Sequence, residues 1–157
     1  MQFSIRLNLA SHILLYLAEY QDQQKVTSEV LSDTTGVNAV NVRKTLGLLK
    51  AAGIVEVRAG VGGAHLTRKP AEITLADIFD AVEDQKEQLF PMHANPNRNC
   101  PVGRSIYSVM DARIKVLEDT MHNEMAQMTL QQMQDDMHMY LRMESEHKEK
   151  EKKHGSD

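Results

Sequence analysis

The chain has 157 residues, of which 41% are apolar and 25% charged, a composition typical of a globular protein with one hydrophobic core. The longest apolar run is Ile13–Ala18, so we expect neither a transmembrane span nor a signal peptide. The single cysteine excludes an internal disulfide, a CxxC pair and a thiolate zinc cage, and the 4% of aromatic residues argue against a stacking surface for single strands.

Charge is distributed unevenly between the two halves of the chain. Residues 1–69 carry 8 Lys/Arg and 5 Asp/Glu, a net +3, whereas residues 70–157 carry 10 and 17, a net −7. A basic first half suits a polyanionic partner, and an acidic second half stays away from one.

Three helices are predicted in the first third of the chain. Apolar residues at helical spacing predict the first helix over residues 3–20. Thr27 and Ser28 are good caps for a short second helix that ends near Gly36. Asn38 then caps a third helix, which an Ala-Ala-Gly step ends.

A β-hairpin is predicted next. Residues 54–58 and 64–67 have the composition of strands, and the glycine-rich segment 59–63 between them suits a turn. Three helices followed by a glycine-tipped hairpin are the order of a winged helix-turn-helix. The predicted fold class is therefore mainly α with a small β-hairpin wing.

The second half of the chain is predicted to be helical apart from one loop. A capping box precedes a short helix over residues 75–84, and prolines break any period over residues 85–101. From Val102 to Met128 apolar residues recur every three or four positions, which predicts a long amphipathic helix. A further helix restarts at Thr129, and residues 144–157 are nearly all charged, which indicates a disordered tail or a frayed helix end.

The third helix and the hairpin carry residue types that recognise DNA. Asparagine can read adenine, arginine can read guanine, and a β-branched methyl group suits the thymine methyl. Phosphates suit lysines such as Lys44 and Lys50, as well as Ser28 and the amide groups of a helix start. A narrow minor groove suits an arginine beside a bare glycine tip. The candidate DNA contacts are Ser28, Asn38, Val40, Asn41, Arg43, Lys44, Arg58, Gly60, Gly62, Gly63 and His65.

Two of these interpretations have alternatives. Taken alone, residues 37–53 are better interpreted as an ordinary amphipathic helix with a solvated polar face; together with the preceding helix, the hairpin and the charge division they favour DNA binding. His65 is either a phosphate contact or an ordinary strand residue.

Several motifs together resemble the Rrf-two family of bacterial winged-helix regulators, which includes an iron–sulfur cluster regulator, a nitric-oxide-sensitive repressor and a cysteine-metabolism repressor. The resemblance covers residues 1–140 and implies a homodimeric regulator, usually a repressor, of a two-fold-related operator. It implies that the third helix and the wing contact DNA and that the long helix pairs the subunits. The wing departs from the family pattern, because Gly63-Ala64-His65 stands where Gly-Gly-Tyr is common. The motifs are Thr27-Ser28-Glu29-Val30-Leu31, Val37-Asn38 with Val42-Arg43-Lys44, Leu49-Lys50-Ala51-Ala52-Gly53-Ile54-Val55, Gly60–Gly63, and Ile73-Thr74-Leu75 with Ile78 and Ala81-Val82.

The loop before the long helix holds a single candidate sensor residue, Cys100. Cluster-binding members of the family place three cysteines in this loop, and one thiolate per chain is a poor donor set for iron–sulfur chemistry, so we expect no cofactor. Pro101 suits the first helical position and places Cys100 near the N-cap, where the helix, with Arg98 and Arg104, lowers a thiol pKa. Cys100 is either a thiol-redox or electrophile sensor or a residue that merely caps or packs.

Eight of the ten methionines lie from Met110 onward, with His122 and His138 among them. Methionine with histidine is compatible with a copper(I) site, but these methionines share the helical face of Ile114 and Leu117. That spacing favours a core or a dimer seam. The sequence holds no nucleophile elbow, phosphate loop or HExxH pair, so we expect no enzyme.

The sequence therefore predicts a cytoplasmic, homodimeric regulator that binds a double-stranded DNA operator, with no membrane partner and with a small effector or an oxidant as its signal. Two alternatives remain open: an adaptor that keeps the winged-helix shape without reading DNA, and a metal-responsive regulator that uses histidine and Cys100. We divide the chain into a DNA-binding domain (1–84), a sensor loop (85–101), a helical dimerisation region (102–143) and a charged tail (144–157).

Overall fold

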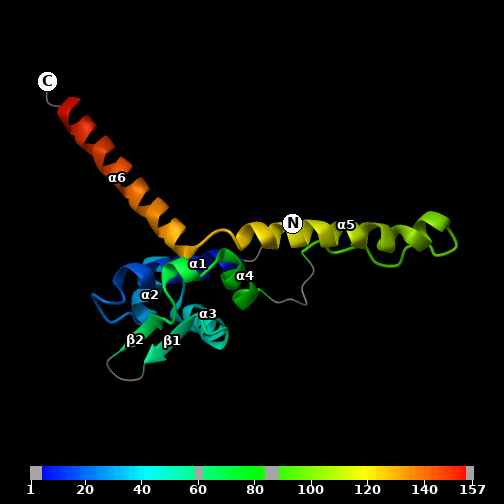
Figure 1. Ribbon diagram of the computed structural model, residues 1–157, viewed down its shortest axis with the longest axis horizontal. Coiled ribbons are helices and arrows are strands. Elements are labelled where there is room, and N and C mark those ends of the chain that lie inside the picture. The colour runs from blue at the N-terminus through cyan, green and yellow to red at the C-terminus, as the bar shows by residue number, and fades with distance from the viewer. Residues whose placement is uncertain (1–4, 59–61, 84–88, 155–157) are drawn as a thin grey trace.

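The computed structural model describes residues 5–58, 62–83 and 89–154, with side chains described as far as residue 150. It confirms the predicted fold class, because helices dominate and the strands form one antiparallel hairpin. Figure 1 shows a winged-helix body from which two long helices diverge. The elements are α1 (Ile5–Tyr20), α2 (Ser28–Thr35), α3 (Ala39–Ala51), β1 (Val55–Arg58), β2 (Gly63–Leu66), a 3-10 turn η1 (Pro70–Glu72), α4 (Leu75–Val82), α5 (Pro101–Met125) and α6 (Leu130–His154).

Side-chain caps set the ends of the short helices. The Thr27 hydroxyl accepts a hydrogen bond from the Val30 amide, so Thr27 caps α2 and Ser28 is its first helical residue. Gly36 ends α2 in the left-handed region at φ 69°, a conformation that favours glycine. The Asn38 side chain caps α3 in the same way, by accepting from the Asn41 amide at 3.0 Å. The helix-turn-helix angle therefore follows from local hydrogen bonds.

The core is built around α1, which packs against α2, α3, α4, α6 and β2. Ile13, Leu14 and Leu17 are fully buried in its centre, and Leu31 of α2 and Leu49 of α3 close over them. Each such side chain contributes roughly 1.5–3 kcal/mol by leaving water. The buried stripe of α3 fixes which face of that helix remains outside.

The wing is joined to the start of α2 as well as to itself. β1 pairs with β2 in the register Val55↔Leu66 to Arg58↔Gly63, and Gly63 forms a parallel bridge with Val26. Gly63 is buried at φ 73°, and a Cβ there would lie 2.6 Å from the Val26 carbonyl oxygen. Glycine is therefore required at this crossing. The tip of the hairpin, residues 59–61 with Gly60, lies outside the described residues.

The two long helices leave the body in different directions, α5 to the right and α6 to the upper left in Figure 1. No residue of α5 is buried, and Val102, Val116 and Leu117 are all more than half exposed. The methionine stripe of α5 is thus no part of the core of this chain. Of the described helices, none is both long and apolar enough to cross a membrane.

Two histidine–carboxylate pairs tie these helices to the body. His122 of α5 lies 2.9 Å from Asp80 of α4. His138 of α6 lies 2.9 Å from Glu19 of α1, which also accepts a hydrogen bond from Gln134 at 2.8 Å. The Gln134 hydrogen bond and His138 together lower the pKa of Glu19, against the opposing effect of its burial.

For the charged C-terminal segment, the sequence leaves open a disordered tail or a frayed helix end, and in the structure α6 continues to His154. Glu144 and Lys148 pair at 2.6 Å one turn apart. Glutamate and lysine are good helix formers, and such pairs add a few tenths of a kcal/mol each. A high charge therefore extends this helix instead of ending it.

Candidate nucleic-acid interface

The outer face of α3 carries the polar residues that the sequence predicts as DNA contacts. Asn41, Arg43 and Lys44 are exposed, as are the preceding Asn38 and Val40, the last at 70%. The opposite face of α3 is buried against α1, so the polar face cannot rotate inward without exposing apolar side chains. These side chains are available to a partner.

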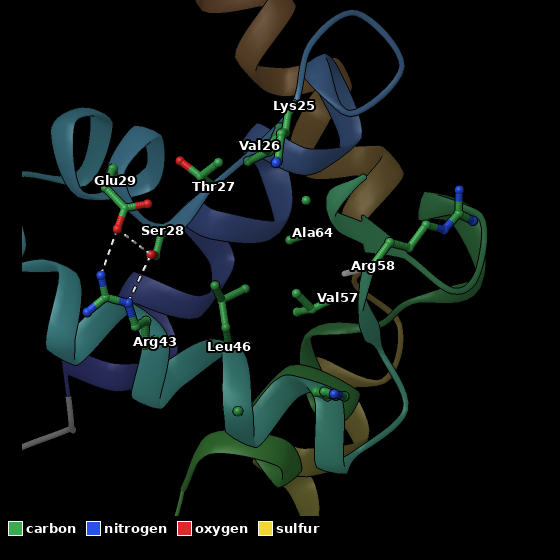
Figure 2. A pocket seen from close by; sticks show the side chains of 13 residues that line it. Lys25, Val26, Thr27, Ser28, Glu29, Arg43, Leu46, Val57, Arg58 and Ala64 are labelled. Atoms are coloured by element: carbon green, nitrogen blue, oxygen red, sulfur yellow. Dashed lines mark hydrogen bonds and ion pairs between the residues drawn. The ribbon is translucent and has the colours of Figure 1, made fainter. Parts of the chain in front are cut away.

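Arg43 is held across the helix-turn-helix by two residues of α2. Its Nε donates to the Ser28 hydroxyl at 3.1 Å, and its Nη2 donates to Glu29 Oε1 at 2.6 Å (Figure 2). The Ser28 hydroxyl in turn donates to Glu29 Oε1 at 3.1 Å. The backbone amide of Glu29 and the Arg43 guanidinium lower the pKa of that carboxyl group to about 2. Glu29 is therefore charged throughout the neutral range.

A cleft of about 490 Å³ lies between the start of α2, the side of α3 and the wing. Leu46, Val57 and Ala64 give it an apolar floor, and four cationic side chains line it with one carboxylate, that of Glu29. Of these cations, Lys25 is not identified from the sequence, and Lys50 is identified there only as a residue suited to phosphates. Lys50 falls on the last turn of α3, and Lys25 precedes the residue that bridges to Gly63. The cationic side chains are Lys25, Arg43, Lys50 and Arg58.

The wing residues differ in how far they reach outward. Arg58 is exposed and extends away from α3 (Figure 2), and its Nε and Nη2 both contact Glu56 Oε1, at 2.7 and 2.6 Å. His65 is half-buried, and its Nε2 donates to the Gly62 carbonyl oxygen at 2.7 Å, which stabilises the end of the turn. Gly62 leaves no room for a Cβ beside Arg58, and Gly63 is buried. Among the candidate wing contacts within the described residues, Arg58 is thus the one with an exposed side chain.

Cys100 lies far from this face, at the end of α5 that points away from the body (Figure 1). It is exposed, it is the N-cap residue of α5, and Pro101 follows at the first helical position, as the sequence predicts. The backbone amides of Gly103 and Val102 lower the pKa of its thiol. The thiolate is therefore favoured by the helix start itself.

Comparison with known proteins places this geometry in a family. The model of the Rrf2 family, described as "Iron-dependent Transcriptional regulator", matches residues 3–136. The Bacillus subtilis protein "Putative HTH-type transcriptional regulator YwnA" is 41% identical over 125 residues, 80% of this chain and 91% of that protein.

Solved structures agree in fold. One described as "Crystal structure of a putative DNA binding protein" is 36% identical, has a TM-score of 0.66 and covers 80% of this chain and 96% of its own. A transcriptional regulator structure from Lactobacillus plantarum, also described as putative, has a TM-score of 0.70 at 23% identity and covers 90% and 97%.

The family description mentions iron, but the described residues of this chain include no set of side chains that could bind it. Among residues 5–58, 62–83 and 89–150, no three His, Cys, Asp or Glu side chains form a group that could hold a metal ion. The chain has one cysteine, whereas iron–sulfur clusters take mostly thiolate ligands. The residues present do not fit an iron–sulfur cluster.

Proposed function

Because the chain belongs to the Rrf2 family and is a DNA-binding transcription regulator, not an enzyme, we propose that it acts as a homodimeric repressor on a two-fold-related operator. One observation carries the proposal: the exposed polar face of α3 continues into the cationic cleft between α2 and the wing. In winged helix-turn-helix proteins, the start of the recognition helix contacts bases in the major groove, and cationic side chains around it contact phosphates. The arrangement here is the same.

The base contacts are assigned to Val40, Asn41 and Arg43. Reading adenine takes both the oxygen and the amide of an asparagine, and the Asn38 oxygen already caps α3. Asn41 has its side chain exposed and only its backbone in the cap, so it is the better adenine reader of the two. Val40 presents methyl groups suited to thymine, and Arg43 presents a guanidinium suited to guanine.

The phosphate contacts are assigned to the residues around these readers. Lys44 and Lys50 flank the reading face on α3, and Ser28 with the first amides of α2 faces the same cleft. Arg58, which extends outward from the wing (Figure 2), is assigned to a minor groove, and Gly62 to the DNA backbone beside it. Gly60, the other glycine assigned to this contact, lies outside the described residues. His65 and Gly63 support the wing from within, and Asn38 supports α3.

A second copy of the chain is proposed to cover α5. This helix has 25 residues, none of them buried, with apolar side chains such as Val109, Val116 and Leu117 exposed along it. An amphipathic helix that leaves the body without burying its apolar side is stabilised by pairing with a like helix. A symmetric pair would present two α3 helices to successive major grooves, about 34 Å apart.

Selection of duplexes from a randomised DNA pool, followed by binding measurements, tests the function. We expect one two-fold-symmetric sequence bound by two protomers. Asn41→Ala should abolish the adenine preference at one position per half-site, a loss of about 1–3 kcal/mol. Lys44→Ala should instead weaken binding to all sequences alike and reduce the slope of log K against log salt concentration by about 1. A protein that enriches no sequence is the adaptor, and the proposal is then wrong.

We infer a second property, that oxidation of Cys100 changes operator affinity. Its exposure and the lowered pKa of its thiol support this, because the thiolate is the form that attacks hydrogen peroxide, which breaks the O–O bond, gives a sulfenic acid and releases hydroxide. Hydrogen peroxide should change the Kd for the selected operator by about fivefold or more in the native protein. Cys100→Ser should abolish that response with its untreated Kd unchanged, and a response that persists in this variant contradicts the inference.

A further inference from the structure

The guanidinium of Arg43 has one edge occupied and one edge open. Nε and Nη2, which lie on the same side of the group, contact Ser28 and Glu29. The other edge, formed by Nη1 with the second hydrogen of Nη2, makes no hydrogen bond or ion pair with a described residue. An open edge of this kind presents two parallel N–H donors, which is the arrangement that guanine O6 and N7 accept.

The three side chains close a ring of hydrogen bonds between two helices. Arg43 donates to Ser28 and to Glu29, and Ser28 donates to Glu29, so each group of the ring fixes the other two. Arg43 sits on α3, whereas Ser28 and Glu29 form the first turn of α2. Isolated exposed ion pairs contribute little to stability, and the side chains here are 56% and 65% exposed. The ring is therefore of interest for orientation and not for folding energy.

The position of the ring gives that orientation a consequence. Arg43 lies on the exposed face of α3 between Asn41 and Lys44, and it lines the cleft beside α2. A long unrestrained arginine at this place can reach a neighbouring phosphate whatever the base sequence. An arginine held along one edge keeps its remaining donors aimed in one direction, so a guanine that lies in line with the open edge satisfies both of them.

We propose, resting on the function proposed above, that Glu29 is a specificity-determining residue that positions Arg43 to read guanine in each operator half-site. Glu29 itself touches no base; it acts through Arg43. If Arg43 leaves Glu29 for a phosphate, it leaves a carboxylate unpaired beside the DNA backbone, and that repulsion penalises sequences without the guanine. Glu29 therefore lowers the affinity for DNA of any sequence and raises the selectivity for guanine at one position.

The test uses the full-length protein and the operator that the native chain selects from a randomised pool. Kd is measured for four versions of that operator, which differ only at the base pair whose preference Arg43→Ala abolishes. The native chain should prefer guanine there by tenfold or more, about 1–3 kcal/mol. Glu29→Ala should reduce this preference by about fivefold or more and leave the preferences at all other positions unchanged.

Two further variants separate positioning from a general effect of charge. Glu29→Gln keeps an oxygen that accepts from Nη2, so it should retain more of the guanine preference than Glu29→Ala. Asp33→Asn removes a negative charge from the same helix at an exposed residue, and it should leave the guanine preference as it is. In the Arg43→Ala background, Glu29→Ala should change nothing at that position, because the residue through which it acts is gone.

The outcomes distinguish the two proposals. If Glu29→Ala keeps the full guanine preference, or alters affinity equally for all four operators, the positioning role is wrong while the DNA-binding function stands. If no base preference depends on Arg43, the positioning role is wrong as well. If the native chain enriches no sequence, the proposed function fails and the role of Glu29 fails with it. Thermal unfolding of each variant confirms that a change in preference is not a loss of fold.

Discussion

The winged-helix body and α5 differ in what holds them. In the body every helix buries part of its surface, and α1 is enclosed by its neighbours. Helix α5 is three times the length of α2, 25 residues against 8, yet none of its residues is buried. Helix length and periodicity thus indicate where a helix forms, whereas the burial of its side chains shows what stabilises it. The body depends on its own core, whereas α5 buries no residue of its own, and we propose that a second copy of the chain covers it.

The largest effect should come from exchanging an apolar residue in the body for a smaller one. Leu14→Ala should lower the free energy of unfolding by about 2–5 kcal/mol, because a fully buried side chain leaves a cavity. Leu117→Asp, at an exposed position on α5, should leave urea unfolding of the body nearly unchanged and weaken self-association by tenfold or more. Denaturant titration and sedimentation equilibrium measure the two effects, and an equal loss of stability in both variants would contradict the comparison.

A smaller effect should separate two glycines of the body. Gly63→Ala places a Cβ against the Val26 backbone at positive φ, so it should destabilise the wing by about 1–3 kcal/mol. Gly47→Ala, on α3, has open space around its Cβ and should stabilise the helix by about 0.5–1 kcal/mol. Hydrogen exchange of the wing amides and thermal unfolding measure the effects of these two substitutions. A neutral Gly63→Ala would show that the wing does not depend on the crossing at Val26.

The smallest effect concerns the carboxylate that ties α6 to the body. The pKa of Glu19 lies below its ordinary value of 4.5 in the folded chain, chiefly because Gln134 donates to it. A lowered folded pKa gives stability that is present above pH 4.5 and is lost as the pH falls through the folded pKa. As the pH is lowered from about 6 to about 3, the free energy of unfolding should therefore fall less for Glu19→Gln than for the native chain. The difference between the two should be less than about 1 kcal/mol. Gln134→Ala should show a similar flattening, and a slope equal to that of the native chain in both variants would exclude this contact as a source of acid sensitivity.

The sequence predicts well those parts of the fold that local chemistry decides. Helix starts at Asn38 and Thr74 and the helix end at Gly36 follow from caps within four residues, and the structure confirms them. The buried stripe of α3 likewise follows from spacing, and it leaves the predicted polar face exposed. Periodicity and capping are short-range signals, so one sequence is enough to show them.

The sequence does not show contacts between residues far apart in the chain. Arg43 meets Glu29 across 14 positions, and Gly63 meets Val26 across a longer interval. The sequence therefore identifies Arg43 as a reader without identifying what holds it, and it groups Gly63 with the tip although that residue is buried. An acidic residue in the first turn of the helix that precedes the DNA-reading helix is the signal that would have pointed to Glu29.

Helix α5 makes the molecule sensitive to small rotations near its attachment to α4. A helix of 25 residues is about 37 Å long, and the His122–Asp80 contact lies close to one end of it while Cys100 lies at the other. Pivoting by about ten degrees at the near end sweeps the far end through about 6 Å. A displacement of the far end by several ångströms therefore corresponds to a rotation of only about ten degrees where the helix meets the body.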